Sequence, residues 1–428
     1  MHVLFVHQNY PAQFGHVAEH LAARHGFRCT YLSEKPARKV GAVERIQYTV
    51  RSGATKETHF CSRTFENAVW HTDAVYQALK ARPDIQPDLI VGHSGFGSTL
   101  FLKELYPNVP IINLFEYFYH AVGSDMDFRP DFPSDEASRL RSRARNAMLL
   151  CDLDNCAVGY SPTAWQRDRF PAEYRNKIRV IHDGIDTNLW KPQAIADRTI
   201  AGRTIPADKK VVTYATRGME SMRGFDVFMK AARKIADRRS DVIFLIAGQD
   251  RVAYGGDDKV TGKMSFKEWV MSQDTYDPER FLFTGLLPPT ELAKLFRLTD
   301  LHIYLTVPFV LSWSLLNALA CGSTILASNT APVREVIRHD ENGLLTDFFD
   351  ADAMADTADR VLSNLGDYRH LGATGVELVR QRYSVDVCLP QMLNLYRDAV
   401  VRAKSSKPRL LTTQVEQPGL VTNPIWVG

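Results

Sequence analysis

Short apolar runs alternate with helix-patterned segments along most of the chain, and this alternation constrains the fold more than any other feature of the sequence. The run "HVLFVH" (2–7) has the composition of a buried parallel strand, and "HVAEHLAARHG" (16–26) follows it with helical spacing and a glycine stop. "FRCTYLS" (27–33) is the next predicted strand. Strand, turn, helix and strand in this order form a βαβ unit, the building block of a doubly wound α/β fold.

The alternation is interrupted once, at 191–208, where the sequence has no clear period and carries two prolines. This stretch is the predicted linker, because 428 residues exceed one ordinary hydrophobic core. We therefore predict an α/β protein with two Rossmann-like domains, 1–190 and 209–385, that face each other across a central cleft. Neither contains a Gly-x-Gly-x-x-Gly fingerprint. A helix over 386–404 is expected to cross back to the first domain, followed by a tail, 405–428.

Charge and composition exclude several classes of function. The formal net charge of +3 is close to neutral for this length and argues against nucleic acid as the main ligand. We expect no signal peptide and no transmembrane helix, since no uninterrupted apolar stretch approaches about 18 residues. The six cysteines favour buried free thiols in a reducing compartment. The predicted location is cytoplasmic, with peripheral contact at the inner face of a membrane left open.

Candidate site residues of the first half follow its strands, because ligands of doubly wound sheets bind beyond the carboxyl ends of the strands. We assign His93 to catalysis and Glu116 to the acceptor side. The polar loop "HQNYPAQFGH" contributes Gln13 and Phe14 on the acceptor side and Gly15 on the donor side, at the start of a helix. His93 ends the strand in "DLIVGHS", and Glu116 lies among aromatics in "NLFEYFYH". Each has a plain structural alternative: an ordinary strand–helix turn, a histidine bound to local backbone, and a structurally packed carboxylate.

Candidate donor-side residues follow strands of the second half. Arg217 and Arg223 lie six positions apart around a turn that opens a helix, an arrangement suited to clamping a diphosphate. The alternative is a charge run on a solvated face. Gly285 and Leu286 belong to a loop stiffened by two prolines, whose backbone could pair with the edge of a base.

The stretch "TVPFVLSWSLLNALACG" is too apolar for a solvent loop and leads into a helix, so its backbone amides could cradle an anion. Asn317 interrupts the apolar faces of that helix and needs partners, either ligand hydroxyls or neighbouring backbone. The cradle residues predicted to bind the donor are Phe309, Val310, Leu311, Ser312, Trp313 and Ser314.

Taken in this order, these stretches resemble a retaining glycosyltransferase of family 4 with the GT-B fold, over roughly residues 1–400. The resemblance is to the subgroup with "VHQNYPAQF" near the N-terminus and "PFVLSWS" in the second half. "ALACGSTILASNTAPVREVIRHDENGLLTDFFD" matches the C-terminal signature of the family, and "VIHDGIDTNLWKP" matches its hinge region. The resemblance implies transfer of a sugar from a nucleotide diphosphate donor with retention of configuration. It also implies donor binding in the second domain and acceptor binding in the first.

The resemblance also assigns roles to individual residues. Arg217 and Arg223 fall on the Arg…Lys pair that holds the diphosphate, with Arg replacing Lys at the second position. His93 falls on a histidine near the donor sugar. Gly15 lies near the glycine-containing loop after the first strand, although the usual Gly-Gly is absent.

Phe309 and Asn317 fall on the two glutamates of the family's paired acids, and Asn317 is the more important departure. An amide can still hydrogen-bond ribose hydroxyls, but without a charge-assisted bond, which costs on the order of 1 kcal/mol. The missing acids do not preclude catalysis, because charge growing on the leaving diphosphate can be neutralised by arginines and helix N-termini.

The predicted function is that of a hexosyltransferase-like enzyme of polysaccharide biosynthesis. It moves a sugar from a UDP- or GDP-sugar to a glycan, a lipid-linked acceptor or a small molecule. We expect no cofactor and no obligatory metal, since no Asp-x-Asp cluster follows a strand near the predicted diphosphate site. The alternatives are a catalytically weakened nucleotide-sugar-binding partner protein and another GT-B enzyme such as a sugar-nucleotide epimerase. Segments 53–70 and 120–140 are expected acceptor loops. The arginine-rich stretch 128–145 fits a lipid-phosphate surface, a glycan or a solvated helix.

Overall fold

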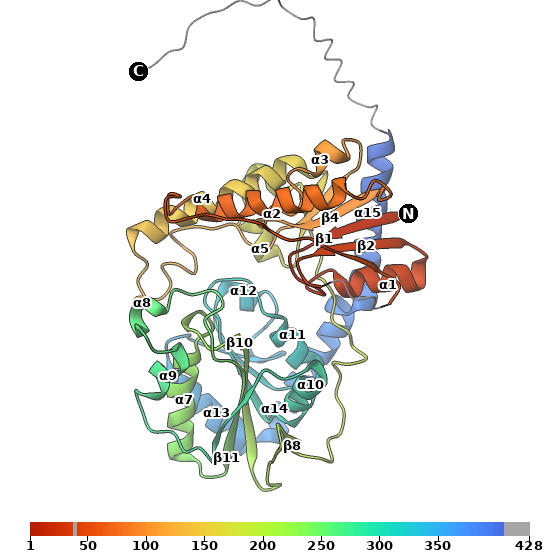
Figure 1. The fold of residues 1–428 in the computed structure, drawn as a ribbon. Helices are drawn as coiled ribbons and strands as arrows, with labels where there is room; N and C mark the ends of the chain where they lie inside the picture. The colour runs from red at the N-terminus through yellow and green to blue at the C-terminus, as the bar shows by residue number, and fades with distance from the viewer. Residues whose placement is uncertain (37–40, 406–428) are drawn as a thin grey trace, which may run out of the picture.

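The computed structural model describes residues 1–36 and 41–405, and confirms the predicted architecture of two α/β domains that face each other (Figure 1). All but the first residue of the predicted tail, 405–428, lies outside the described residues. One domain is built mainly from the first half of the chain, and the other from the second half.

The N-terminal domain is built on a parallel sheet of seven strands in the described part of the chain, in the order β3-β2-β1-β4-β5-β6-β7. Its strands are β1 (His2–Val6), β2 (Arg28–Ser33), β3 (Glu44–Gln47), β4 (Leu89–His93), β5 (Ile111–Leu114), β6 (Val158–Ser161) and β7 (Ile178–Val180). Its helices are α1 (Gly15–His25), α2 (Arg63–Lys80), α3 (Leu102–Leu105), α4 (Glu136–Asn155), α5 (Ala164–Asp168) and α6 (Ala172–Arg175).

Both faces of this sheet are buried, which explains why its strands are continuous apolar runs in the sequence. Val3 and Phe5 of β1 pack on one side, in a cluster with residues of α1 and of the last helix, α15 (Val385–Ser405). Leu4 and Val6 point to the other side, toward α2 and α4. Because successive strand residues face opposite ways, each strand joins two layers of helices.

The C-terminal domain is built on a parallel sheet of six strands within the described residues, in the order β12-β11-β10-β13-β14-β15. These strands are β10 (Lys210–Gly218), β11 (Val242–Gln249), β12 (Phe281–Gly285), β13 (Leu301–Tyr304), β14 (Ile325–Ser328) and β15 (Leu344–Thr346). The helical segments are η1 (Ser221–Arg223), α7 (Phe225–Arg238), α8 (Asp258–Thr261), α9 (Phe266–Met271), α10 (Pro289–Leu298), α11 (Trp313–Ala320), α12 (Ala331–Arg334), α13 (Ala351–Ser363), α14 (Leu365–Leu378) and η2 (Val379–Tyr383), the last a π-helix.

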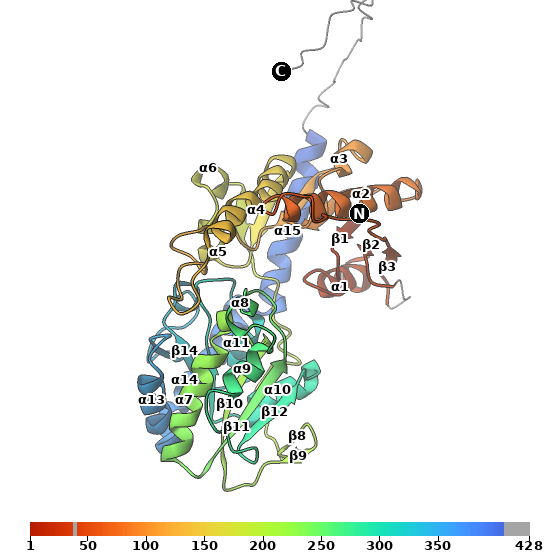
Figure 2. The same ribbon diagram turned by 60° about the vertical axis from the view of Figure 1, so that its left-hand side comes forward.

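The chain passes between the domains at two places that lie side by side. The Ile185 amide donates to the carbonyl oxygen of Tyr383 at 2.7 Å, and the Val385 amide donates to that of Ile185 at 3.0 Å. Gly184 has φ 92° and a Cβ there would lie 2.9 Å from the Val385 Cα, so this crossing requires glycine. Beyond it, α15 runs along the N-terminal domain (Figure 2).

Two further contacts join the domains at their facing edges. Arg129 of the N-terminal domain is 4% exposed and its guanidinium donates to both carboxylate oxygens of Asp226 on α7, at 2.9 and 2.7 Å. Glu335, which follows α12, accepts hydrogen bonds from the Ala164 and Trp165 amides at the start of α5. Glu335 therefore caps a helix of the other domain.

Two segments differ from the sequence-based expectation. The predicted linker contains a short antiparallel hairpin, β8 (Thr199–Ile200) and β9 (Arg203–Thr204), whose Ile200 is buried in the core of the C-terminal domain. The second half of the expected acceptor loop 53–70 is helical, because α2 begins at Arg63. Two-residue strands and a helix that starts among polar residues leave too little periodicity for the sequence pattern to indicate them.

Candidate active site

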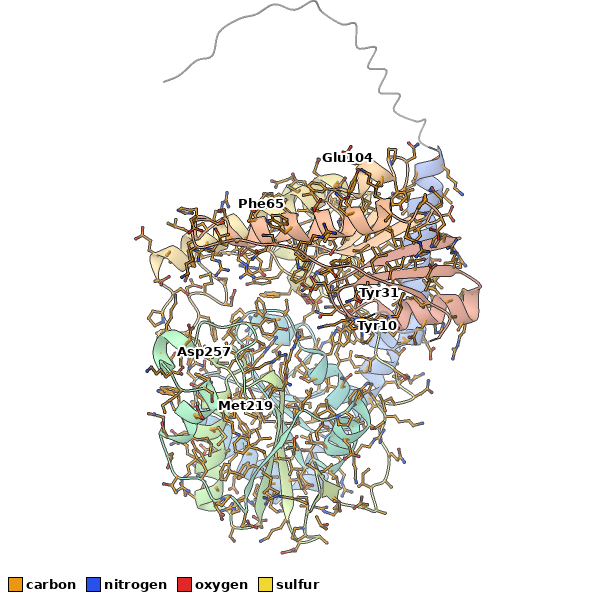
Figure 3. All side chains as sticks on the ribbon, viewed as in Figure 1. Tyr10, Tyr31, Phe65, Glu104, Met219 and Asp257 are labelled. Carbon is orange, nitrogen blue, oxygen red and sulfur yellow. The ribbon has the colours of Figure 1, made fainter. Side chains whose placement is uncertain are left out.

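Two cavities lie between the domains, near the carboxyl ends of both sheets. Their volumes are about 560 and about 430 Å³, and they lie next to each other, because Tyr119, Arg145 and Tyr254 are among the residues that line both. Figure 3 shows side chains projecting into the space between the domains, with Asp257 on the rim of the C-terminal domain. This volume and position are those of a ligand site in a doubly wound fold.

His93 and Glu116 meet on the N-terminal wall of the larger cavity. The Nε2 atom of His93 lies 3.4 Å from a Glu116 carboxylate oxygen, an ion-pair distance without hydrogen-bond geometry, and its Nδ1 atom lies 3.0 Å from the carbonyl oxygen of Ser94. The Gln13 amide donates to the other Glu116 oxygen at 3.0 Å. The structure thus brings together three residues that the sequence analysis assigned separately.

The charges of this group determine the protonation state of each member. Burial would lower the pKa of His93, but the Glu116 carboxylate beside it raises that pKa. Burial would raise the pKa of Glu116, but the charge of His93 and the hydrogen bond from Gln13 lower it. Glu116 is therefore an ionised hydrogen-bond acceptor that faces the cavity.

Arg223 belongs to the C-terminal domain, is 6% exposed and lines a small cavity beside Ser312 and Ser314 rather than the two interdomain cavities. One Nη atom donates to the hydroxyl of Thr306 at 2.8 Å and to the carbonyl oxygen of Val310 at 3.1 Å. The guanidinium also lies 5.4 Å from the centre of the Tyr254 ring. Among the described residues no carboxylate lies within ion-pair distance of it, so a buried cation is held ready for an anion.

Arg217, in contrast, is exposed at the end of β10 and has no hydrogen bond or ion pair among the described residues. The pairing of β10 with β11 shifts register between Ala215 and Gly218, a bulge that re-aims the side chain. Gly285 and Leu286 are also exposed, and Leu286 is 65% accessible. The structure thus does not join Arg217 to Arg223 in a clamp, and neither Gly285 nor Leu286 lines the cavities.

The backbone cradle of 309–314 is smaller than predicted, because some of its amides already donate hydrogen bonds within the domain. The Ser312 amide donates to the Tyr304 hydroxyl at 2.9 Å. Ser312 is the N-cap of α11, and its side chain accepts a hydrogen bond from the Ser314 amide at 3.3 Å. The amides of Val310 and Leu311 donate no hydrogen bond to any described residue. These two N–H groups remain for an anion.

Phe309 and Asn317, the positions of the family's paired acids, have different surroundings. Phe309 packs edge-on against Tyr117 of the N-terminal domain, with ring centres 4.8 Å apart, so it forms part of the domain contact. Asn317 is 9% exposed, and its side-chain amide has no hydrogen-bond partner among the described residues. The described part of the chain therefore shows no backbone partner for this amide, and Asn317 does not line either interdomain cavity.

The loop before α1 places its residues in two different environments. Tyr31 holds the loop by donating to the carbonyl oxygens of Asn9 and Pro11, and it lies against Tyr10 (Figure 3). Gly15 is needed here because a Cβ would lie 2.4 Å from that of Pro11. Phe14 is 1% exposed in the core and cannot offer its side chain to an acceptor, which corrects its predicted role. An aromatic next to a helix start is apolar enough to be buried.

Sequence reasoning missed Asp183 in the hinge segment. Its side chain is 6% exposed, and the side chain of Trp313, which comes from the other domain, lies next to it. Burial raises the pKa of Asp183 to about 7, and the negative charge of Glu116 adds to that rise. His16 contacts the Asp183 carbonyl oxygen at 2.8 Å. In the sequence, "VIHDGIDTNLWKP" indicates the hinge region but does not single out this carboxylate.

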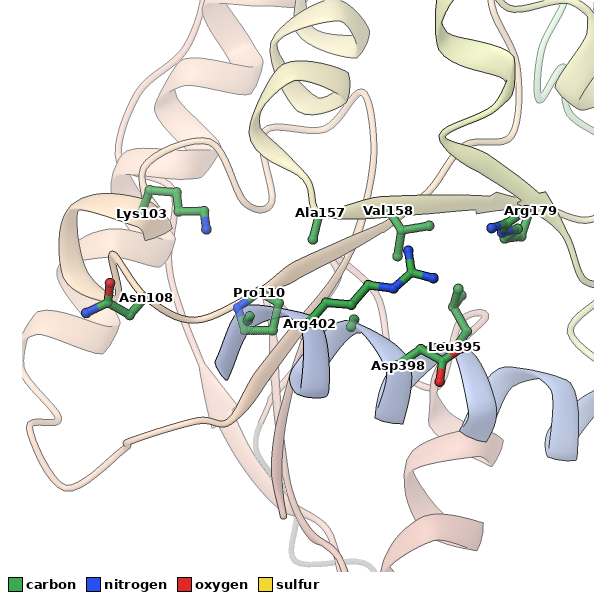
Figure 4. A pocket seen from close by; sticks show the side chains of 11 residues that line it. Lys103, Asn108, Pro110, Ala157, Val158, Arg179, Leu395, Asp398 and Arg402 are labelled. Atoms are coloured by element: carbon green, nitrogen blue, oxygen red, sulfur yellow. The ribbon is translucent and has the colours of Figure 1, made fainter. Parts of the chain in front are cut away.

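A separate cavity lies on the opposite edge of the N-terminal domain, between α15 and the amino ends of β5 and β6 (Figure 4). It is lined by apolar and charged side chains, including Lys103, Arg179 and Arg402. Ligands of parallel sheets bind at the carboxyl edge. This cavity is therefore not part of the candidate active site.

Within the described residues, no group of three or more His, Cys, Asp or Glu side chains is placed to hold a metal ion. In the same residues, no helix has both the length and the apolar character needed to span a bilayer.

Comparison with known proteins gives a consistent picture. Residues 25–190 match the family profile described as "Glycosyl transferase family 4 group", and residues 197–377 match "Glycosyl transferases group 1". A D-inositol 3-phosphate glycosyltransferase from Corynebacterium glutamicum is 24% identical over 74% of this chain and 74% of its own. The chain spans about half the length of several other curated relatives that it matches.

Two solved structures are similar in fold. Sucrose-phosphate synthase from Thermosynechococcus elongatus superimposes with a TM-score of 0.71 at 20% identity, over 94% of this chain and 99% of the other. An Anabaena protein in complex with UDP and glucose gives 0.64 at 14% identity, over 93% and 100%.

Proposed function

The chain belongs to the glycosyltransferases of the GT-B fold, and from this premise we propose that it is a retaining enzyme that moves a sugar from a nucleotide diphosphate donor to an acceptor. The donor is a UDP- or GDP-sugar bound on the C-terminal side of the cleft. The acceptor is a glycan, a lipid-linked sugar or a small molecule bound on the N-terminal side. A structural neighbour that holds UDP and glucose supports the donor class.

The observation that carries this proposal is the environment of Arg223. It is a buried guanidinium without a carboxylate partner among the described residues, next to the unbonded amides of Val310 and Leu311. Charge that develops on a leaving diphosphate would be stabilised here by a group already in place, which is the most effective form of electrostatic catalysis.

The remaining groups fit a transfer that does not use two catalytic carboxylates. Asn317 presents an unpartnered amide to the ribose hydroxyls. Glu116, kept ionised by His93 and oriented by Gln13, accepts a hydrogen bond from an acceptor hydroxyl. Loss of the diphosphate through an oxocarbenium-like state then depends on positive groups and position.

The test is release of nucleotide from a panel of sugar nucleotides, namely UDP-glucose, UDP-N-acetylglucosamine and GDP-mannose, with the full chain. Arg223→Ala should weaken UDP or GDP binding by about 10- to 150-fold, the loss of a charge-assisted bond of about 1.5–3 kcal/mol. Arg238→Ala is the control, since Arg238 lies on the surface and pairs with Asp356. Equal nucleotide affinity in wild type and Arg223→Ala would refute the role of this residue.

Asn317 supports a second candidate function, that of a binding protein of the same fold that holds nucleotide sugars without turnover. An amide at the ribose position binds more weakly than a carboxylate, which is the reason to consider it. Nucleotide binding without release of sugar, across the panel and with added acceptors, would favour this candidate. Interconversion of one sugar nucleotide into another without any acceptor would favour an epimerase instead.

A further inference from the structure

Two arginines of α4 face the interdomain cavities. The helix begins at Asp135, whose side chain accepts a hydrogen bond from the Ser138 amide at 2.8 Å. Arg141 and Arg145 lie four positions apart on one face of it and line both cavities. Arg139 and Arg143 of the same run are exposed. The arginine-rich stretch is therefore not one solvated face, because two of the four arginines on α4 line the interdomain cavities.

Neutral groups are the described partners of the two inward arginines. Arg145 donates to the Tyr119 hydroxyl at 2.7 Å and lies 3.8 Å from the centre of that ring. Arg141 donates to the Thr64 hydroxyl at 3.3 Å and lies 5.0 Å from the centre of the Phe60 ring. The Nε atom of each is buried without a hydrogen-bond partner. No carboxylate of the described chain reaches ion-pair distance of either arginine.

Three of the four acidic groups that line the cavities have partners of their own, and the fourth, Asp258, is exposed. Asp125 accepts from the Tyr117 hydroxyl at 2.7 Å, and burial raises its pKa. Glu116 is paired with His93, as described above. Asp257 accepts from the amide and hydroxyl of Ser221. Of the Arg and Lys side chains that line the cavities, Arg129 and Lys259 are paired with carboxylates, and Arg141 and Arg145 are not paired with any carboxylate of the described residues.

The two guanidiniums also act on each other. Burial lowers the pKa of Arg141, and the charges of Arg145 and Arg63 lower it further. Like charges held together in a partly buried site are unfavourable unless an anion joins them. Guanidinium groups bind phosphoryl oxygens with two parallel hydrogen bonds, a geometry that lysine does not offer.

We propose that the acceptor carries a phosphoryl group, and that Arg141 and Arg145 bind it within the interdomain cavity. The larger cavity is lined by these arginines and by Glu116, so one ligand can contact both. The phosphoryl group would occupy the arginine end while an acceptor hydroxyl lies against the carboxylate. This inference rests on the proposed function in one respect, that the ligand is the acceptor of the transferred sugar. Binding of the phosphoryl group itself can be measured without any turnover.

The experiment measures binding of four small probes to the full chain by calorimetry: inorganic phosphate, glucose 6-phosphate, glucuronate and glucose. Glucose 6-phosphate should bind at least about tenfold more tightly than glucose. The double variant Arg141→Gln/Arg145→Gln should lose this preference, while Arg139→Gln/Arg143→Gln on the same helix should keep it. Arg141→Lys/Arg145→Lys keeps the charges and should retain part of the preference, which separates binding from misfolding.

A second arm distinguishes a lipid headgroup from a free sugar phosphate. The full chain is sedimented with phosphatidylinositol vesicles and, for comparison, with phosphatidylcholine vesicles. Binding to the phosphatidylinositol vesicles that is lost in Arg141→Gln/Arg145→Gln identifies a lipid-linked source. Binding to the sugar phosphate without co-sedimentation identifies a free one. Both results support the phosphoryl site.

Three results would overturn the inference. They are equal binding of glucose and glucose 6-phosphate, equal loss in the inward and outward pairs, and glucuronate binding as tightly as glucose 6-phosphate, which would assign a carboxylate. UDP binding is measured in parallel and should be unchanged in the inward pair. If wild type binds glucose 6-phosphate but no nucleotide, the proposed function fails while the phosphoryl site stands.

Discussion

Asp183 makes the stability of this protein depend on pH near neutrality. Its carboxyl is buried at the domain crossing, and its pKa is raised from 3.8 to about 7. Between these two pH values the folded chain keeps a proton that the unfolded chain has released. The free energy of unfolding therefore falls as pH rises from about 4 to about 7, and the loss is complete above the folded pKa.

The magnitude follows from the difference between the two pKa values. At about 1.4 kcal/mol for each pH unit, a group that titrates near 7 instead of 3.8 contributes a loss of about 4 kcal/mol. Asp183→Asn replaces the carboxyl by an amide of similar shape that does not titrate. The variant should gain stability relative to wild type as pH rises, by up to that amount.

The assay is urea unfolding of both proteins at about pH 5 and about pH 8, followed by fluorescence. Because the Trp313 side chain lies next to Asp183, wild-type fluorescence should also titrate with a midpoint near 7, and the variant should not. The other ionisable groups are common to both proteins and cancel in the comparison. Parallel stability curves for the two proteins across this range would refute the burial argument.

The remaining predictions concern the cleft. Asn317→Glu should tighten nucleotide binding by about fivefold or more through a charge-assisted bond to ribose, measured by calorimetry; unchanged affinity would place the side chain in the core. Glu116→Gln should move the pKa of His93 from above to below its ordinary value, because burial then acts unopposed. NMR titration of the ring measures this change, and a His93 pKa that stays raised would show that Glu116 is not the cause. Arg129→Met should destabilise by about 3–5 kcal/mol, since Asp226 then loses its buried cation, and a melting temperature equal to that of wild type would contradict this.

The fold could be predicted from the sequence because both sheets are buried on two faces. Strands such as β1 and β11 are then continuous apolar runs, and helices between them have a clear period. The short hairpin in the linker and the start of α2 at Arg63 carry no comparable signal. Local pattern gives the order of elements but not the ends of those that begin among polar residues.

The site could be predicted only as far as the edge of the sheets. The sequence pattern places residues that follow strands at the carboxyl edge of the sheet, and His93 and Glu116 meet there. The direction of a side chain depends on local geometry that the sequence does not show. A bulge exposes Arg217, whereas the turn of η1 buries Arg223. The same limit applies to an arginine run, where helical phase and the position of the partner helix decide which cations enter the cleft.

The pairing of the two chain crossings at Ile185 and Ser384 has a topological consequence. The C-terminal domain is an inserted domain, because the N-terminal domain consists of a first segment that ends there and of α15, which returns from the far side of the insertion. Leu389, Met392 and Tyr396 of α15 belong to the core of that domain. A fragment that stops at residue 190 would expose this apolar face to water, whereas 186–384 is one continuous piece of chain. Of the two domains, only the C-terminal one is therefore continuous in sequence.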